Sequence, residues 1–167
     1  MKDRLLKGSE TMIIRKAEPK DFDGMNRLFK QVDGVHSKAH PNMFNEPIDN
    51  VRSNEYLKNI LDDDTQNLIV CVDGDEVVGL AKAMIESAPE FPLFVQRRWM
   101  LISIIVVDEM HRGKGIGQLL LDDQYKWAKD NDINEVELTV FSFNETAMKF
   151  YSKNGFNEVK RKLYKKI

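Results

Sequence analysis

The sequence predicts one domain of mixed α/β class. Strand-like apolar runs and helix-like spacings alternate along the chain in the order βααββ followed by βαβαβ. A chain of 167 residues is typical of one domain, and it buries enough surface to fold without a disulfide or a metal. We therefore expect a single domain over residues 12–167. Residues 1–11 are expected to be a polar leader that is disordered or is an added extension.

Composition excludes several classes of protein. The chain has 25 basic and 27 acidic residues, and this balance argues against broad nucleic-acid binding. The longest nearly apolar run, residues 100–107, is far shorter than the roughly 20 residues that span a bilayer. Cys71 is the single cysteine, so no intrachain disulfide can form and a reducing cytoplasm is the expected location. We expect neither a nucleic-acid nor a membrane partner.

The first third of the chain predicts one strand and two helices. A short apolar run at residues 12–15 indicates the strand. Gly34 is expected to end a helix whose apolar face consists of Phe22, Met25, Leu28, Phe29 and Val32. Residues 35–47 carry His36, His40 and two prolines, a pattern typical of a helical turn broken by loops. A second helix is expected over residues 50–61.

The rest of the chain opens with a hairpin. Asp73-Gly74 between two apolar runs is a strong hairpin signal. The unbroken apolar character of residues 99–107 predicts a strand that is buried on both faces. The remaining elements are expected to be a helix, a strand, a short helix and a final strand pair, over residues 115–129, 136–140, 144–154 and 156–164.

The segment between residues 107 and 117 carries the clearest chemical signal. It joins a strand to a helix, and glycines alternate at the point where the helix begins. Glycine lets backbone N–H groups approach a ligand closely, and the N-terminus of a helix favours an anion such as phosphate. Cationic side chains flank the glycines. We therefore expect an anion-binding loop made of Arg112, Gly113, Lys114, Gly115, Ile116 and Gly117.

Two familiar phosphate motifs do not fit this loop. A P-loop requires Ser or Thr after Gly-Lys, but Gly115 follows Lys114. The dinucleotide fingerprint requires a third glycine at positions that Gln118 and Leu120 occupy. Binding of ATP or NAD is therefore poorly supported. A glycine-rich turn that only starts a helix is the remaining alternative when the loop is taken alone.

A second stretch completes a recognisable pattern. Arg112-x-x-Gly115-x-Gly117 has the spacing of an acetyl-CoA pyrophosphate loop, and it is followed by Asn144-x-x-Ala147-x-x-Phe150-Tyr151-x-x-Asn154-Gly155-Phe156. Together they resemble the GNAT superfamily of N-acetyltransferases. The resemblance implies a mixed, mostly antiparallel twisted sheet flanked by helices, with acetyl-CoA as cosubstrate and no metal. Glu109 departs from the pattern, because the family often has proline there.

The resemblance also implies a mechanism of direct transfer. The backbone amides of Ile105, Val106 and Val107 would polarise the thioester carbonyl, and Asn144 would contact the cofactor. Tyr151 would protonate the departing thiolate. The attacking amine needs a base or a water relay, because amines are mostly protonated at pH 7. Glu86 is the candidate for this base, with Glu137 as the alternative.

The acceptor half of the site is less readable. An amine of a small molecule or peptide is the implied substrate, and residues 33–49 and 86–98 are expected to select it. The second segment carries apolar residues beside Arg97 and Arg98, which suits a binding surface, packing within the domain or a homodimer contact. The arginines would read a substrate carboxylate or pair with acidic residues. A non-catalytic CoA-binding module is the competing hypothesis, although retention of Tyr151 argues against it.

Overall fold

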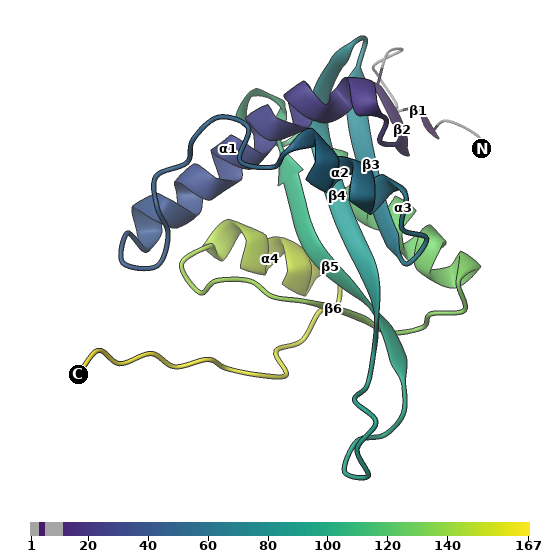
Figure 1. The fold of residues 1–167 in the computed structure, drawn as a ribbon, viewed down its shortest axis with the longest axis vertical. Coiled ribbons are helices and arrows are strands. Elements are labelled where there is room, and N and C mark those ends of the chain that lie inside the picture. Colours follow the sequence, from purple (N-terminus) through teal and green to yellow (C-terminus); the bar gives the residue numbers. More distant parts are fainter. Residues whose placement is uncertain (1–3, 6–11) are drawn as a thin grey trace.

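The computed structural model describes residues 4–5 and 12–167, and its centre is a six-stranded sheet (Figure 1). The strands follow one another across the sheet in sequence order. All neighbours are antiparallel except the last pair, which is parallel. The strands are β1 (Arg4–Leu5), β2 (Met12–Lys16), β3 (Gln66–Asp73), β4 (Glu76–Ser87), β5 (Arg98–Val107) and β6 (Val136–Leu138). Apart from β1, the predicted leader lies outside the described residues.

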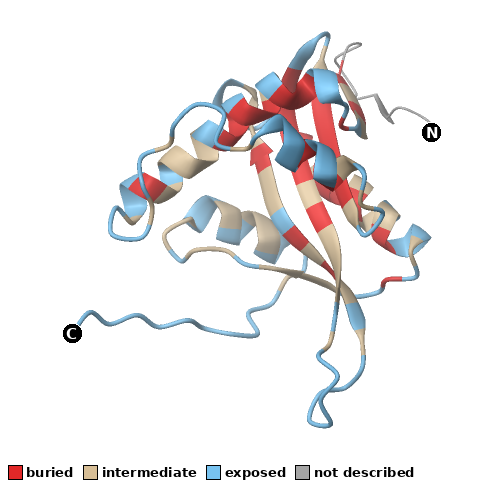
Figure 2. Ribbon diagram, viewed as in Figure 1, coloured by how far each residue is buried: buried red, intermediate tan, exposed pale blue. Residues whose placement is uncertain are grey.

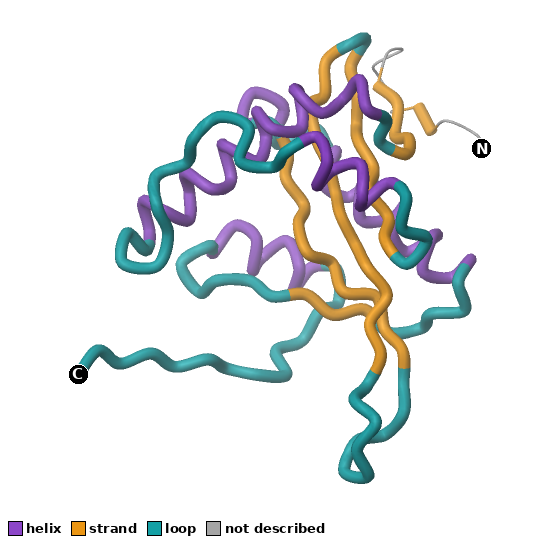
Figure 3. The backbone as a smooth tube through the Cα atoms, in the orientation of Figure 1, coloured by secondary structure: helices purple, strands orange, loops and turns teal. Residues whose placement is uncertain are grey.

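Helices cover both faces of this sheet, as the tube in Figure 3 shows. The helices are α1 (Phe22–Ala39), α2 (Asn54–Leu61), α3 (Ile116–Asp130) and α4 (Glu145–Lys153). Short 3-10 turns at Pro19–Asp21 and Glu109–His111 precede α1 and α3. The first two helices share one face, and α3 packs on the other. The predicted fold class is confirmed: a mixed, mostly antiparallel sheet flanked by helices.

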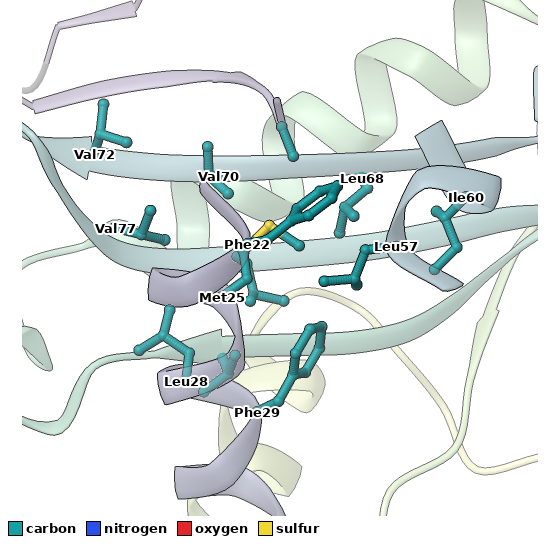
Figure 4. Close-up of a cluster of buried hydrophobic side chains, with 13 residues drawn as sticks. Phe22, Met25, Leu28, Phe29, Leu57, Ile60, Leu68, Val70, Val72 and Val77 are labelled. Carbon is teal, nitrogen blue, oxygen red and sulfur yellow. The ribbon is translucent and has the colours of Figure 1, made fainter. Parts of the chain in front are cut away.

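The core on the α1 face forms where the two N-terminal helices meet the sheet (Figure 4). Helical spacing in α1 places Met25 and Leu28 toward β3 and β4, and both side chains are fully buried. Leu57 of α2 fills the adjacent position. Figure 2 shows that burial is concentrated in the central strands and in the helix faces that cover them. This rigid layer fixes where β5 ends.

The opposite face depends on a close approach of α3 to β4. A Cβ built on Gly79 would lie 2.9 Å from Cγ2 of Ile116 and 3.2 Å from Cδ1 of Leu120. Glycine favours this close approach, because a side chain at residue 79 would collide with those two side chains. Farther along α3, the buried Gln124 accepts a hydrogen bond from Asn67 at 3.1 Å and donates to the Ala81 carbonyl at 3.3 Å. These contacts fix the helix that carries the glycine loop.

We predict that Gly79→Ala destabilises the protein by about 1–3 kcal/mol, because it overpacks the contact between α3 and β4. Denaturant unfolding measures the change. Gly34→Ala is the matched control: its Cβ would lie 3.7 Å from Pro47, an ordinary contact, and alanine is the better helix former. It should be neutral or stabilising. Equal stability of the Gly79 variant and wild type would refute close packing at this point.

Two predicted helix boundaries are wrong. Gly34 does not end the first helix, and α1 continues to Ala39 through residues expected to form broken turns. Tertiary packing outweighs the low helix propensity of glycine here, because Ser37 in the next turn is buried. The second helix begins at Asn54 rather than residue 50. The Ser53 hydroxyl accepts a hydrogen bond from the Tyr56 N–H at 3.1 Å and so caps it there.

The prediction that the apolar strand is buried on both faces is also wrong. Met100, Ile102 and Val106 of β5 are buried, but Leu101 and Ile104 are only half-buried and Ser103 is exposed. The parallel pairing with β6 ends at Ile102. Within the described residues, no strand covers β5 beyond that point on this side. In the described part of the chain, the C-terminal half of β5 therefore has a strand partner on one side only, β4.

The predicted final strand pair over residues 156–164 is absent. The described chain after α4 holds no strand, and it extends away from the sheet (Figure 1). Val159 and Leu163 are 90% and 85% exposed. Their alternation with charged residues resembles a strand, but a strand also requires a hydrogen-bonding neighbour. The pattern over residues 156–164 therefore reflects strand propensity in a segment that pairs with no neighbouring strand among the described residues.

Candidate functional site

The glycine loop has the geometry of an anion cradle. Gly113 and Gly115 adopt φ angles of +79° and +81°, the left-handed region that glycine tolerates. Apart from each glycine and its two chain neighbours, no described heavy atom lies within 4 Å of a Cβ built on either residue, so the backbone is open to a ligand. Arg112 and Lys114 are exposed beside it. The loop ends at the N-terminus of α3, where the first N–H that bonds back to the helix is that of Gln118.

A buried carboxylate holds the start of this loop. Asp108 is only 3% exposed and accepts hydrogen bonds from Gln31 at 3.0 Å, from the Met110 N–H at 2.9 Å and from Arg27. His111 lies 3.3 Å away. Burial alone would raise the pKa of Asp108, but these hydrogen bonds outweigh burial and hold the pKa well below its ordinary value of 3.8. The carboxylate is therefore charged at neutral pH.

Arg27 of α1 connects this carboxylate to the start of β4. Besides Asp108, its guanidinium donates to the Val77 carbonyl at 2.7 Å and to Glu76 at 2.9 Å. Gln31, one turn later in α1, also accepts a hydrogen bond from the Glu109 N–H at 3.3 Å. Helix α1, the start of β4 and the glycine loop are thus fixed relative to one another. Sequence reasoning did not single out Arg27, Gln31 or Asp108 for a role.

The register of β5 leaves part of the strand free on one side. Lys82 pairs with Ile104 and Ala83 pairs with Ile102, so Ser103 is the extra residue of a β-bulge. The Asp108 N–H donates to the Val78 carbonyl of β4 at 2.9 Å. Since successive backbone groups alternate in direction, the N–H groups of Ile105 and Val107 point away from β4, and that of Val106 points toward it. We call residues 103–107, on the side away from β4, the open edge of β5.

The predicted capping residues of α4 are in place. The Asn144 side chain accepts a hydrogen bond from the Ala147 N–H at 3.1 Å, and Gly155 follows the helix with φ of +84°. A Cβ built on Gly117 would lie 3.7 Å from the Phe150 ring. Helix α4 therefore packs beside the first turn of α3, next to the glycine loop. The structure brings the glycine loop and the stretch that begins at Asn144 together beside the end of β5, since the Cβ built on Gly117 also lies 3.9 Å from Val107.

Tyr151 lies half-buried on α4. Its ring packs against Phe150 and Phe156, with centroid separations of 5.3 and 5.6 Å. Burial, followed by the nearby Tyr125 of α3, raises the pKa of Tyr151 above its ordinary value of 10.0. The phenol is therefore protonated at neutral pH and able to donate a proton.

The candidate bases lie farther along the sheet. Glu86 of β4 pairs with Trp99, about 13 Å along the strand from the bulge at Ser103. Glu137 of β6 lies closer, opposite Leu101, but it accepts a hydrogen bond from Arg97 at 2.5 Å. The structure thus does not bring Glu86 against the amides of the open edge. Either carboxylate would reach an amine there only through water.

The predicted acceptor segments divide between a protruding hairpin and an aromatic cluster. The loop between β4 and β5 extends away from the body, and its tip exposes Phe91, Leu93, Phe94 and Val95 (Figure 1). Arg97 pairs with Glu135 and Glu137 and lies 4.3 Å from the centroid of the Trp99 ring. Of the two roles predicted for the arginines, pairing with acidic residues is the one that Arg97 performs.

The aromatic cluster joins the end of α1 to the segment that follows β6. His36 and His40 lie 5.3–5.9 Å, centroid to centroid, from Phe141 and Phe143, and Phe44 stacks on His36 at 5.4 Å. We call these five residues the aromatic cluster. No sequence pattern predicted that these rings meet, although His36 and His40 lie in the segment over residues 33–49 that was expected to select the acceptor. For Phe141 and Phe143, the signal that the sequence offered was two phenylalanines at alternate positions just after a predicted strand.

Two features of the described residues bear on membrane and metal binding: the length and apolar character of the helices, and the grouping of metal-ligating side chains. None of its helices has the length and apolar character needed to cross a bilayer. Residues 4–5 and 12–167 contain no group of three or more His, Cys, Asp or Glu side chains arranged to hold a metal ion. Cys71 is a free cysteine that is buried in β3, and burial raises the pKa of its thiol to about 11. That thiol is unreactive at neutral pH.

Comparison with known proteins gives a consistent answer. The sequence model of the acetyltransferase (GNAT) family matches residues 31–156. The chain is 26% identical over 152 residues to the L-amino acid N-acetyltransferase AaaT of Escherichia coli, covering 87% of this chain and 82% of that protein. It is 38% identical over 64 residues to the uncharacterized N-acetyltransferase YobR of Bacillus subtilis, which covers 38% of this chain and only 26% of YobR.

Solved structures share the fold along nearly the whole chain. A tetramutant of the BH1408 protein from Bacillus halodurans superimposes with a TM-score of 0.86 at 28% identity, covering 93% of this chain and 99% of that one. Glucosamine-6-phosphate N-acetyltransferase from Arabidopsis thaliana superimposes with a TM-score of 0.68 at 20% identity, covering 94% and 99%. The second likeness concerns the fold alone.

Proposed function

Because the chain belongs to the acetyltransferase (GNAT) family, we propose that it transfers an acetyl group from acetyl-CoA to a primary amine by direct attack. The observation that carries the proposal is the open glycine loop at the start of α3. Positive φ angles at Gly113 and Gly115, together with free space over both, suit backbone amides that contact a pyrophosphate. Arg112 and Lys114 supply positive charge beside it.

The open edge of β5 is the proposed place of the thioester. The N–H groups of Ile105 and Val107 point away from β4 and would donate to the carbonyl oxygen as negative charge develops there. The Val106 N–H points toward β4, so its proposed part is limited to the packing of its buried side chain. Asn144, which already caps α4, would hold the cofactor on the other side of this edge.

Residues on both sides of the open edge would share the chemistry. The amine nitrogen forms a bond to the carbonyl carbon, the carbon–sulfur bond breaks, and the amine loses a proton. Tyr151 donates its phenolic proton to the departing sulfur, since burial keeps that phenol protonated. Glu86 is the proposed acceptor of the amine proton through water, and Glu137 is the alternative that lies closer to the bulge.

The proposed acceptor is a small molecule or peptide that carries a primary amine. An L-amino acid is the first candidate, because the name of AaaT gives that substrate class. A cytoplasmic location and a homodimer through the exposed hairpin tip remain proposals. They are supported only by the single buried cysteine and by the apolar residues of that tip.

Gly115→Val tests the cofactor half. We expect it to weaken acetyl-CoA binding by at least tenfold, because the branched side chain would occupy the space above the loop. Calorimetric titration measures the affinity. Gly74→Val in the β3–β4 turn is the matched control, since its φ of +60° imposes similar strain far from the loop. It should lose stability and keep its affinity. Unchanged affinity in the Gly115 variant would exclude this loop as the pyrophosphate site.

A turnover assay separates the enzyme from the competing hypothesis. Thiol release from acetyl-CoA is followed across a panel of amines, alongside a direct binding measurement. Binding without release of thiol on any amine would favour a non-catalytic CoA-binding module. Melting temperatures with acetyl-CoA, ATP and NAD complete the comparison. Only acetyl-CoA is expected to raise the melting temperature, because the loop lacks the P-loop and dinucleotide spacings.

A further inference from the structure

The aromatic cluster lies on the sheet face opposite the helix that carries the glycine loop. Val136 and Leu138 pack with residues of α3. Phe141 and Phe143 follow this strand, and both rings contact His36 of α1, so they lie on the face that α1 covers. Alternation of side chains along β5 places Ile104 on the same face, in the core cluster of α1 and α2. One face thus carries the anion loop and the other carries the aromatic rings.

With the cofactor on the opposite face, an acceptor would reach the open edge from the α1 face. Helix α3 and the glycine loop lie on the opposite face, where the nucleotide part of the cofactor would bind. Leu101 and Ile104 are half-buried on the α1 face, as are all five rings of the aromatic cluster. Strand β4 adds two half-buried charged side chains to this face: Lys82, which pairs with Ile104, and Glu86. Glu137, the acidic side chain nearest to them in register, is paired with Arg97.

We propose that the aromatic cluster is the acceptor subsite and that it binds an aromatic or large apolar group on the amine. This inference rests on the proposed acetyl transfer and adds the substrate class. Five half-buried rings from the end of α1, the following loop and the segment after β6 pack against one another on this side of the sheet. Such a surface favours an apolar group over a small or polycationic amine.

The charge state of the cluster supports this substrate class. Burial, opposed by Asp33 and reinforced by His40, lowers the pKa of His36 below its ordinary value of 6.5. His36 is therefore neutral at pH 7. Asp33, the carboxylate that opposes the lowering of the His36 pKa, forms an ion pair with Arg52. Arg52 in turn lies 4.4 Å from the centroid of the Phe29 ring. The carboxylate that acts on His36 is thus already paired with a cation.

Matched pairs of amines test the subsite. We would compare 2-phenylethylamine with ethylamine, and L-phenylalanine with glycine, in steady-state acetylation by wild type. The aromatic member of each pair should have a kcat/KM at least about tenfold higher. Phe141→Ala should remove most of that preference by raising the KM of the aromatic amine. It should leave ethylamine, glycine and acetyl-CoA affinity unchanged. Phe91→Ala on the exposed hairpin tip is the control and should change none of these values.

Folding and turnover are monitored separately. Phe141→Leu keeps an apolar side chain, so it should fold as wild type and lose preference only for the aromatic member. Binding of 2-phenylethylamine and ethylamine to the CoA complex is also measured by calorimetry, so the subsite is tested even without turnover. Equal kcat/KM and equal binding within each pair would overturn the subsite. Loss of acetyl-CoA binding in wild type would instead overturn the proposed function.

Discussion

Tyr151→Phe is expected to slow the chemical step by roughly 10²–10⁴, the usual contribution of a general acid. The substitution keeps the ring, so its contacts with Phe150 and Phe156 remain and cofactor affinity should barely change. Single-turnover acetylation measures the step directly, because slow product release would hide the effect in kcat. Normal single-turnover rates in this variant would remove Tyr151 from the mechanism and leave thiolate departure to solvent.

Tyr125→Phe is the matched control for this experiment. Tyr125 lies on α3 near Tyr151, and burial followed by Asp122 raises the pKa of its phenol as well. Its loss should leave the chemical rate near that of wild type. The pH dependence offers a second check. Because the pKa of Tyr151 lies above 10.0, the acid form persists through neutral and mildly alkaline pH. The rate should therefore show no decline from this group below about pH 10.

Asp108→Asn is expected to lower the stability of the protein and also to weaken acetyl-CoA binding. The amide removes the negative charge that faces Arg27 and cannot accept every hydrogen bond that converges on Asp108. We expect a loss of about 2 kcal/mol or more. This lies below the ~3–5 kcal/mol typical of a fully buried pair, since the Arg27 side chain is 40% exposed. Unfolding in denaturant and calorimetric titration measure the two effects.

Glu76→Gln is the control, because Glu76 pairs with the same arginine but is 58% exposed. It should cost less than about 1 kcal/mol and leave cofactor binding unchanged. The sign of the pH effect follows from the lowered pKa. The charged Asp108 contributes stability above its ordinary pKa of 3.8, and this contribution is lost as the pH falls through the lower folded-state pKa. The gap in stability between wild type and Asp108→Asn should therefore shrink in acid. A stability difference that stays constant with pH would show that the negative charge of Asp108 does not stabilise the fold.

Local patterns in the sequence predicted the elements that depend on neighbouring residues. The hairpin at Gly74, the glycine loop and the α4 cap at Asn144 all appear where the sequence indicated. Each depends on the backbone freedom of glycine or on a side chain that bonds a few residues away. The helix that continues past Gly34 and the unpaired segment over residues 156–164 show the opposite case. In the first case, tertiary packing extended a helix through a glycine. In the second, no neighbouring strand was present among the described residues to pair with a segment of strand-like sequence.

By itself, the sequence determined the fold class and the position of the proposed phosphate loop, because both follow from short-range periodicity and glycine spacing. Only the tertiary structure decided which distant residues support and surround that loop. Arg27 and Asp108 meet although they are 81 residues apart, and His36 meets Phe141 from another part of the chain. Such contacts depend on how the helices pack on the sheet and on the bulge at Ser103. No local pattern encodes them, since they arise only when the whole core closes.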